Sequence, residues 1–210
     1  TTPMTFVATA NALRYNNLMP VFVDIDDTLN INPAKIEQKI TPRTKAILAV
    51  DFAGQPCNYT ILKRLAEKHN IKLIEDAAHA LGASFDGTKV GNIADVTAFS
   101  FHPVKNITTG EGGMITTNEK DVYDKCLMLR HHGIDRNDKS FGGDWSFNMK
   151  VLGRNYRLTD FQCALGISQL KKVDRFNKRR AEIVAQYTTE FEKINEIKLP
   201  AQKNDSHAWH

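Results

Sequence analysis

Three short, mainly apolar runs follow one another in the first half of the chain, and a helical pattern separates the first two. The runs cover residues 44–50, 71–75 and 96–101, and each holds β-branched or aromatic side chains. Strands buried on both faces have this composition, because helices cover both sides of a parallel sheet. The order of strand, helix and strand therefore predicts an α/β fold, a three-layer α/β/α sandwich with a mostly parallel sheet.

Further helices and strands are expected on either side of these runs. Asn58 is expected to cap a helix with an apolar face, and Asn32 followed by Pro33 indicates another helix start. Residues 133–155, rich in Gly, Asp and Asn, form a loop long enough to suggest a function. The other expected elements are helices at 7–13, 32–40, 119–131 with Asn118 as cap, 159–170 and 173–194, and strands at 20–23 and 114–117.

A lysine follows the third apolar run at a point where the chain has to turn. Pro103 stops the strand, Lys105 comes two residues later, and Gly110, Gly112 and Gly113 let the backbone turn tightly. A lysine in this place can be partly desolvated, which lowers the pKa of the amine and favours imine chemistry. Lys105 taken alone fits a solvated surface residue better, since most lysines after strands are exposed.

A carboxylate stands in the matching place after the second run. Asp76 follows residues 71–75 directly, and the small residues after it let a ligand approach the backbone. Ligands of open α/β sheets bind at this end of the strands. Asp76 and Lys105 are together the two groups that a pyridoxal 5'-phosphate enzyme needs. The lysine forms a Schiff base with the cofactor, and the acid keeps the pyridine nitrogen protonated.

Composition argues against several classes of function. The 210 residues carry a formal charge of +4, and the basic residues within 171–180 alternate with apolar ones at helical spacing, so nucleic-acid binding is not expected. No apolar run approaches membrane-spanning length, and no signal peptide is expected.

The cysteines, histidines and glycines fit none of the common cofactor motifs. Cys57, Cys126 and Cys163 lie far apart, as expected for reduced thiols in the cytoplasm. The spacing of cysteine and histidine matches no zinc pattern, so no metal site is expected. The glycines after Lys105 do not form the GxGxxG of a dinucleotide fold.

Six motifs along nearly the whole chain resemble those of the DegT/StrS-type nucleotide-sugar aminotransferases. The sequence Ser-Phe-His-Pro-Val-Lys at 100–105, followed by Thr-Thr-Gly-Glu-Gly-Gly at 108–113, is most similar to the branch of that family in the pseudaminic acid pathway. The six motifs lie at residues 2–11, 20–26, 75–83, 100–105, 109–113 and 153–158.

The resemblance implies the aspartate aminotransferase type of fold, which is fold type I of the pyridoxal phosphate-dependent transferases. It also implies a homodimer and gives each candidate residue a role. Lys105 and Asp76 would be the catalytic pair. The further implied cofactor contacts are Phe6 on the ring face, His79 at the ring hydroxyl, Ser100 at the phosphate, and Asn155 at the phosphate of the neighbouring subunit's cofactor.

Each of these residues also has an ordinary explanation. An aromatic such as Phe6 is a core residue by default. His79 fits a buried histidine bonded to backbone, Ser100 fits a serine satisfied by its own backbone, and Asn155 would mean nothing as an isolated loop residue. The resemblance and the pairing of Asp76 with a lysine favour the cofactor roles.

The implied reaction moves an amino group from L-glutamate to C4 of a nucleotide-linked 4-keto-6-deoxy sugar. In the pseudaminic acid branch this substrate is UDP-2-acetamido-2,6-dideoxy-β-L-arabino-hex-4-ulose. Two alternatives stay open. One is a sugar dehydratase on the same scaffold, in which a histidine replaces the lysine, and the other is a regulatory protein without activity. The presence of Lys105 favours transamination.

The resemblance also implies a division of the chain. Residues 1–170 are expected to form the large cofactor-binding domain without its N-terminal part. Residues 171–210 are expected to form a bridging helix and the start of a truncated small C-terminal domain.

Overall fold

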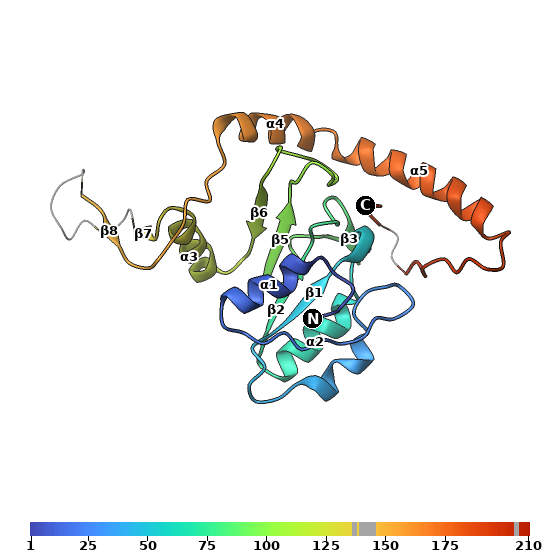
Figure 1. The fold of residues 1–210 in the computed structure, drawn as a ribbon, viewed down its shortest axis with the longest axis horizontal. Coiled ribbons are helices and arrows are strands. Elements are labelled where there is room, and N and C mark those ends of the chain that lie inside the picture. The colour runs from blue at the N-terminus through green and yellow to red at the C-terminus, as the bar shows by residue number, and fades with distance from the viewer. Residues whose placement is uncertain (136–137, 139–145, 204–205) are drawn as a thin grey trace.

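A four-stranded sheet lies at the centre of the computed structural model, which describes residues 1–135, 138, 146–203 and 206–210 (Figure 1). Strands β1, β2 and β5 run parallel, whereas β6 is antiparallel to β5. The sheet order is β1 (Ala46–Val50), β2 (Lys72–Asp76), β5 (Val96–Ser100) and β6 (Gly113–Thr116). The expected mostly parallel sheet is therefore confirmed.

The register brings the carboxyl ends of the three parallel strands together. Asp76, the last residue of β2, pairs with Val50 of β1 and with Ala98 of β5. The backbone N–H of Asp51 donates to the Asp76 carbonyl over 3.1 Å, which extends the ladder beyond β1. Ligands of α/β sheets bind at this edge, so the register places Asp76 where a site is expected.

Helix α2 (Tyr59–Lys68) covers one face of the sheet. Its buried residues Tyr59, Leu62 and Leu65 belong to one core cluster with Ile47 of β1 and Phe99 of β5. The side chain of Asn58 accepts a hydrogen bond from the backbone N–H of Ile61, which satisfies a donor of the first turn and confirms the expected cap.

Helix α1 (Val7–Tyr15) lies over the opposite face, with a cavity between helix and sheet. Successive side chains of a strand point to opposite faces. Leu48, Ile74 and Ala98 therefore face the cavity. Ile47 and Leu73, one position earlier on β1 and β2, belong to the core cluster that includes residues of α2. Helices on both faces of the sheet confirm the three-layer arrangement.

Helices α4 (Asp160–Leu170) and α5 (Val173–Phe191) follow the strands of the sheet in the chain. Helix α4 begins with a capping box, in which the Thr159 hydroxyl accepts from the N–H of Gln162 and the Gln162 side chain accepts from the N–H of Thr159. Figure 1 shows α4 and α5 in succession along one side of the molecule. The remaining helices and strands are β3 (Ser84–Phe85), β4 (Thr88–Lys89), α3 (Lys120–Arg130), β7 (Ile134–Asp135) and β8 (Asn148–Met149).

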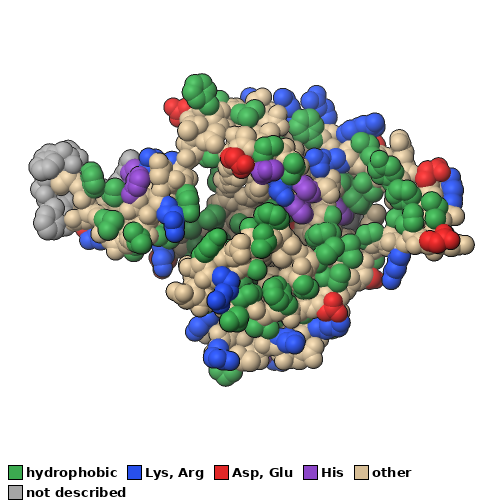
Figure 2. Space-filling model, viewed as in Figure 1, with side chains coloured by type: hydrophobic (Ala, Val, Ile, Leu, Met, Phe, Trp, Pro, Cys, Tyr) green, Lys and Arg blue, Asp and Glu red, His purple; other side chains and the backbone are tan. Residues whose placement is uncertain are grey.

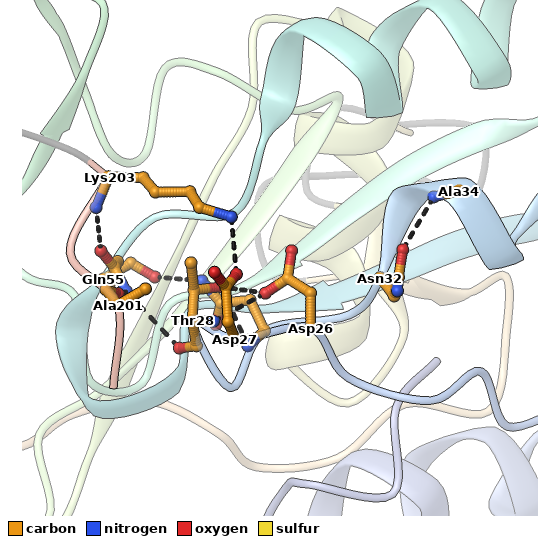
Figure 3. Close-up of polar contacts among 9 residues, drawn as sticks. Asp26, Asp27, Thr28, Asn32, Ala34, Gln55, Ala201 and Lys203 are labelled. Carbon is orange, nitrogen blue, oxygen red and sulfur yellow. Dashed lines mark hydrogen bonds and ion pairs between the residues drawn. The ribbon is translucent and has the colours of Figure 1, made fainter. Parts of the chain in front are cut away.

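The end of the described chain returns to the loop after β1. Gln55 donates from Nε2 to the carbonyl of Ala201 over 3.0 Å and accepts from the N–H of Lys203 over 2.9 Å (Figure 3). Lys203 Nζ also pairs with Asp27 Oδ1 at 2.6 Å. Ala208 contacts the short turn η3 (Phe52–Gly54), because its backbone N–H donates to the Gly54 carbonyl over 2.9 Å. These contacts hold residues 201–203 and 206–210 against the loop that follows β1.

Two expected elements near the start of the chain are wrong. Residues 20–23 are not a strand, because their contact with Thr1 is too short for a ladder: Thr1 donates to Val21 and accepts from Val23. Residues 32–40 form two 3₁₀ turns, η1 (Pro33–Lys35) and η2 (Glu37–Lys39), where an α-helix was expected. Asn32 does cap the first turn, by accepting from the N–H of Ala34. Pro42 keeps the segment from continuing as a helix.

The expected cap of the helix after β6 is also wrong. Glu119 is the N-cap of α3, and the Asn118 side chain donates to Asn92 Oδ1 over 2.8 Å. The Glu119 N–H is satisfied by the Thr117 hydroxyl. The cap was misplaced because Asn118 has a tertiary partner that the local pattern does not contain. In the part of the chain that the structure describes, no helix is long and apolar enough to cross a membrane.

Candidate functional site

A cavity of about 830 Å³ opens at the carboxyl ends of the parallel strands, beneath α1. Figure 2 shows histidine and basic side chains in a hollow at the middle of this face. Five of the six residues predicted for the site line this cavity: Lys105, Asp76, His79, Ser100 and Phe6. The fold thus brings together residues that lie up to 99 positions apart, from Phe6 to Lys105.

Asn155 is the predicted site residue that does not line this cavity. It lies beyond α3, where it forms an isolated bridge with His131, and its side chain accepts from the N–H of Arg157 over 3.4 Å. The side chain is exposed. Asn155 therefore does not contribute to the cavity of its own chain.

Asp76 is held by two donors, one on each oxygen. Thr9 Oγ1 donates to Asp76 Oδ2 over 2.7 Å, and the backbone N–H of Ala78 donates to Oδ1 over 3.2 Å. Each oxygen of an ionised carboxylate can accept two hydrogen bonds. Asp76 thus keeps acceptor capacity toward the cavity.

Lys105 lies in the loop that joins β5 to β6. Its backbone N–H donates to the His102 carbonyl over 3.0 Å, which closes a turn before the lysine. Partial burial lowers the pKa of the Lys105 amine, and the charge of Asp76 opposes this shift. A lysine with a lowered pKa reaches the neutral, nucleophilic form at lower pH.

The glycines after Lys105 close this loop against the strands. The Phe101 N–H donates to the Gly112 carbonyl over 2.9 Å, and the Thr109 N–H donates to the Phe101 carbonyl over 3.0 Å. A Cβ on Gly113 would approach the Phe99 carbonyl oxygen to 2.6 Å, so only glycine fits there. The predicted tight turn is confirmed, and it fixes both ends of the segment that carries Lys105.

His79 is a neutral donor toward the cavity. Burial, together with the charge of Lys105, lowers the pKa of His79 to about 4. Its Nδ1 accepts from the backbone N–H of Ala53 over 3.2 Å, which assigns the proton of the neutral ring to Nε2. The ring stacks on His210 with centroids 3.9 Å apart.

Ser100 and Phe6 present different surfaces to the cavity. The Ser100 hydroxyl oxygen accepts from the N–H of His102 over 3.3 Å, which leaves the hydroxyl proton to be donated elsewhere. The Phe6 ring is 74% exposed, so it is not the core aromatic that its sequence context suggested.

Two supporting residues have no signal in the sequence. Thr9 contacts Asp76 from another element, 67 positions away. Asn106 follows Lys105 and is buried, and its Nδ2 donates to Asn177 Oδ1 over 2.9 Å and to the Ala208 carbonyl over 2.8 Å. Both act through contacts between distant segments, which local patterns do not encode.

A buried pair of acids lies beside the site. Asp51 and Glu75 are fully buried, and Asp51 accepts from the Tyr59 hydroxyl over 2.7 Å. Glu75 accepts from the Thr97 hydroxyl over 2.5 Å. Burial and the charge of Glu75 raise the pKa of Asp51 well above its usual range.

The residues that line the cavity fit the ring end of pyridoxal 5'-phosphate. The site offers an amine of lowered pKa, a carboxylate with free acceptor capacity, an imidazole N–H donor and an exposed aromatic face. Among the described lining residues, Lys105 is the only lysine or arginine. The donor set here therefore matches the ring and the aldehyde more completely than the phosphate. Among the described residues, no three His, Cys, Asp or Glu side chains are grouped to hold a metal.

The model of the DegT/DnrJ/EryC1/StrS aminotransferase family matches residues 1–210. The UDP-4-amino-4,6-dideoxy-N-acetyl-beta-L-altrosamine transaminase of Campylobacter jejuni serotype O:23/36 is 44% identical over 212 residues. That match covers 98% of this chain and 55% of the transaminase. The chain thus spans about half the length of the curated relatives it matches.

Solved structures of two sugar aminotransferases resemble the fold of this chain. Helicobacter pylori PseC, an aminotransferase of pseudoaminic acid biosynthesis, is 39% identical with a TM-score of 0.87, covering 92% of this chain and 51% of PseC. The PMP form of the putative sugar aminotransferase Spr1654 from Streptococcus pneumoniae is 32% identical with a TM-score of 0.89. It is matched over 99% of this chain and 58% of its own. The expected fold is confirmed by these neighbours.

Proposed function

The chain belongs to the DegT/DnrJ/EryC1/StrS aminotransferase family, and from this premise we propose that the protein is a pyridoxal 5'-phosphate-dependent nucleotide-sugar aminotransferase. The amino group would move from L-glutamate to C4 of a nucleotide-linked 4-keto-6-deoxy sugar. The observation that carries the proposal is the meeting of Lys105, Asp76 and His79 in one cavity at the carboxyl ends of the parallel strands.

Lys105 is proposed as the covalent anchor and the proton carrier. Its Nζ would hold the cofactor through the aldehyde carbon, with loss of water, until an amino donor takes its place. The freed amine would then carry the proton that leaves the donor's α-carbon. The lowered pKa of Lys105 supports this role, because more of the neutral amine is present at a given pH.

Asp76 and His79 are proposed to hold the two polar atoms of the ring. When bound, the cofactor supplies an electron sink for the bond-breaking steps, and a protonated ring nitrogen makes this sink effective. Asp76 holds that proton by charge. His79 donates from Nε2 to the ring hydroxyl, a donor role that the glutamine common in the family can also fill.

Phe6 and Ser100 are proposed to bind the two remaining parts of the cofactor. The exposed Phe6 ring packs on the ring face, and the Ser100 hydroxyl donates to the phosphate. Both residues line the same cavity as Lys105, which supports these roles.

We propose further that the functional unit is a homodimer. Asn155 lies outside its own cavity and is exposed, so a partner's cavity is where its side chain would act. Large apolar side chains near it in the sequence are exposed too, as expected of a surface that a second copy covers. They are Phe147, Met149, Leu152, Tyr156 and Phe161.

Two finer predictions of the sequence stay proposals. The division into a domain at 1–170 and a bridge with the start of a second domain at 171–210 is supported by the run of α5 away from the sheet (Figure 1). A cytoplasmic location is supported by the free thiols of Cys57, Cys126 and Cys163.

The proposed sugar is the UDP-linked 2-acetamido-2,6-dideoxy-4-hexulose of the L-arabino configuration. The C. jejuni relative, named as a transaminase of a UDP-linked amino sugar, supports this choice. An inverted stereocentre presents the other face of the ketone, and an enzyme that positions reacting atoms closely discriminates between such epimers.

The test offers the protein a panel of nucleotide 4-ketosugars with L-glutamate and follows 2-oxoglutarate. We expect the L-arabino compound to react far faster than its D-xylo epimer. A preference for the D-xylo or a dTDP-linked sugar would remove the pseudaminic acid branch and leave the aminotransferase. If no sugar in the panel leads to formation of 2-oxoglutarate from L-glutamate, the proposed function is overturned.

A further inference from the structure

Thr9 is a buried residue on a largely exposed helix. Its side chain is 6% exposed, although α1 lies over an open cavity. Phe6, three positions earlier, also lines the cavity, as expected of residues that share one side of a helical turn. The first turn of α1 therefore presents both an aromatic ring and a hydroxyl to the site.

The direction of the hydrogen bonds around Thr9 is fixed by proton count. Thr9 Oγ1 lies 2.7 Å from Asp76 Oδ2 and 2.7 Å from Thr5 Oγ1. An ionised carboxylate only accepts, so the single hydroxyl proton of Thr9 goes to Asp76. The hydroxyl of Thr5 must then donate the hydrogen bond that joins the two threonines. The order Thr5 to Thr9 to Asp76 is a relay in which each donor polarises the next.

This relay bears on the direction of the Asp76 carboxylate. Thr9 on Oδ2 and the Ala78 N–H on Oδ1 fix the plane of the carboxylate at two points. A carboxylate held in a fixed direction can hold a proton on a ring nitrogen by charge.

We propose that Thr9 is a positioning residue of this site: its hydroxyl keeps the Asp76 carboxylate oriented so that the acid holds the proton on the cofactor's ring nitrogen. The inference rests on the proposed function. Thr9 does not itself touch the reacting atoms, and it acts through Asp76.

The first test compares Thr9→Val, Thr9→Ser and Thr5→Val in the cofactor-loaded protein. Valine has the shape of threonine without the hydroxyl, and serine keeps the hydroxyl. The matched control is Thr60→Val, because Thr60 forms an exposed hydroxyl contact with Asp86 at 3.4 Å outside the cavity. Far-ultraviolet circular dichroism verifies that each variant is folded.

Nitrogen NMR of cofactor labelled at the ring nitrogen reads out the position of the proton. We expect a protonated ring nitrogen in the wild type, in Thr9→Ser and in Thr60→Val, and a shift toward the unprotonated signal in Thr9→Val. Thr5→Val should give a smaller shift, because it removes the relay's first donor only. A wild-type signal in Thr9→Val, or failure of serine to restore it, would overturn the proposal.

Kinetics separate positioning from substrate binding. Thr9→Val removes a hydrogen bond to a charged group, and we expect this loss to lower kcat by roughly 10- to 100-fold. KM for the sugar should change little, because Thr9 acts on Asp76. A rise in KM with unchanged kcat would count against the proposed role.

A final measurement does not need the cofactor. Crystal structures of cofactor-free wild type and Thr9→Val should show the Asp76 carboxylate rotated in the variant. An unchanged carboxylate overturns the role of Thr9 even if the protein proves to bind no pyridoxal phosphate. A wild type that binds no cofactor would defeat the proposed function by itself, while this comparison still decides on Thr9.

Discussion

The backbone N–H of Ala53 donates to Nδ1 of His79 over 3.2 Å, and this contact decides which nitrogen of the imidazole carries the proton. Ala53 reaches this geometry with a left-handed backbone, at a φ of 53°. His79 then faces the cavity as an N–H donor. Its lowered pKa, about 4, keeps it neutral at neutral pH.

The titration of His79 tests this assignment. We expect the imidazole resonance that disappears in His79→Gln to titrate with a midpoint near 4. The unfolded chain takes up this proton at a higher pH than the folded protein, so His79 makes stability fall as pH drops from about 6.5 toward 4. His79→Gln should therefore lose less stability over this window in urea titrations. A midpoint above 6 would contradict the buried, neutral ring.

Lys105 should be the residue that borohydride links to the cofactor. Its pKa is lowered, whereas the ion pair with Asp138 raises the pKa of Lys150 and keeps that amine charged. Reduction followed by peptide mapping should label Lys105. Lys105→Ala should abolish both label and transfer, and Lys150→Arg should affect neither. A label on Lys89 or Lys150 would contradict the assignment.

Asp76→Asn should bind the cofactor and fail in transfer. The amide keeps the size of the side chain but cannot hold the pyridinium proton by charge. We expect transfer to fall by roughly two orders of magnitude or more, while the dissociation constant of the cofactor changes far less. Single-turnover kinetics and equilibrium dialysis measure the two effects. Unchanged turnover would mean that another residue is the acid.

Asn155 should act on a partner's cavity. We expect the protein to sediment as a dimer and Asn155→Ala to weaken cofactor binding. Mixing inactive Lys105→Ala with Asn155→Ala should restore part of the activity, because a mixed dimer holds one site with both native residues. The control mixes Lys105→Ala with Asp76→Asn, which leaves a defect in every site. A fully active monomer would refute the dimer.

Gly54 should tolerate a side chain less well than Gly87. Both have positive φ, 93° and 75°, so alanine strains the backbone at each. A Cβ on Gly54 would also meet the backbone carbonyl oxygen of His79 at 2.8 Å and the backbone nitrogen of Trp209 at 2.9 Å. A Cβ on Gly87 would meet nothing within 4 Å. We expect Gly54→Ala to lower the free energy of unfolding by about 1–3 kcal/mol more than Gly87→Ala. Equal losses in urea titrations would show that backbone strain dominates at both positions.

The sequence predicted the strands and turns whose cause is local. β1, β2 and β5 were found because their apolar runs are short and end at turn residues, and Thr159 was found as a helix start because its cap lies three residues away. The strand at 20–23, the helix at 32–40 and the cap at Asn118 were wrong. Two of these depended on a neighbour, because a strand needs a ladder partner and Asn118 bonds Asn92 instead of the helix. The third, at 32–40, is limited by Pro42, which disfavours a continued helix.

The sequence by itself determined that an acid and a lysine follow neighbouring buried strands, since parallel strands end at one edge of a sheet. Only the tertiary structure decided how they are supported. The hydroxyl of Thr9 on Asp76, the N–H of Ala53 on His79 and the place of Asn155 outside its own cavity all depend on which distant segments pack together. Local propensity fixes where a strand ends. The hydrogen bonds that orient a side chain at that strand end come from donors and acceptors on distant segments, which the fold brings within about 3 Å.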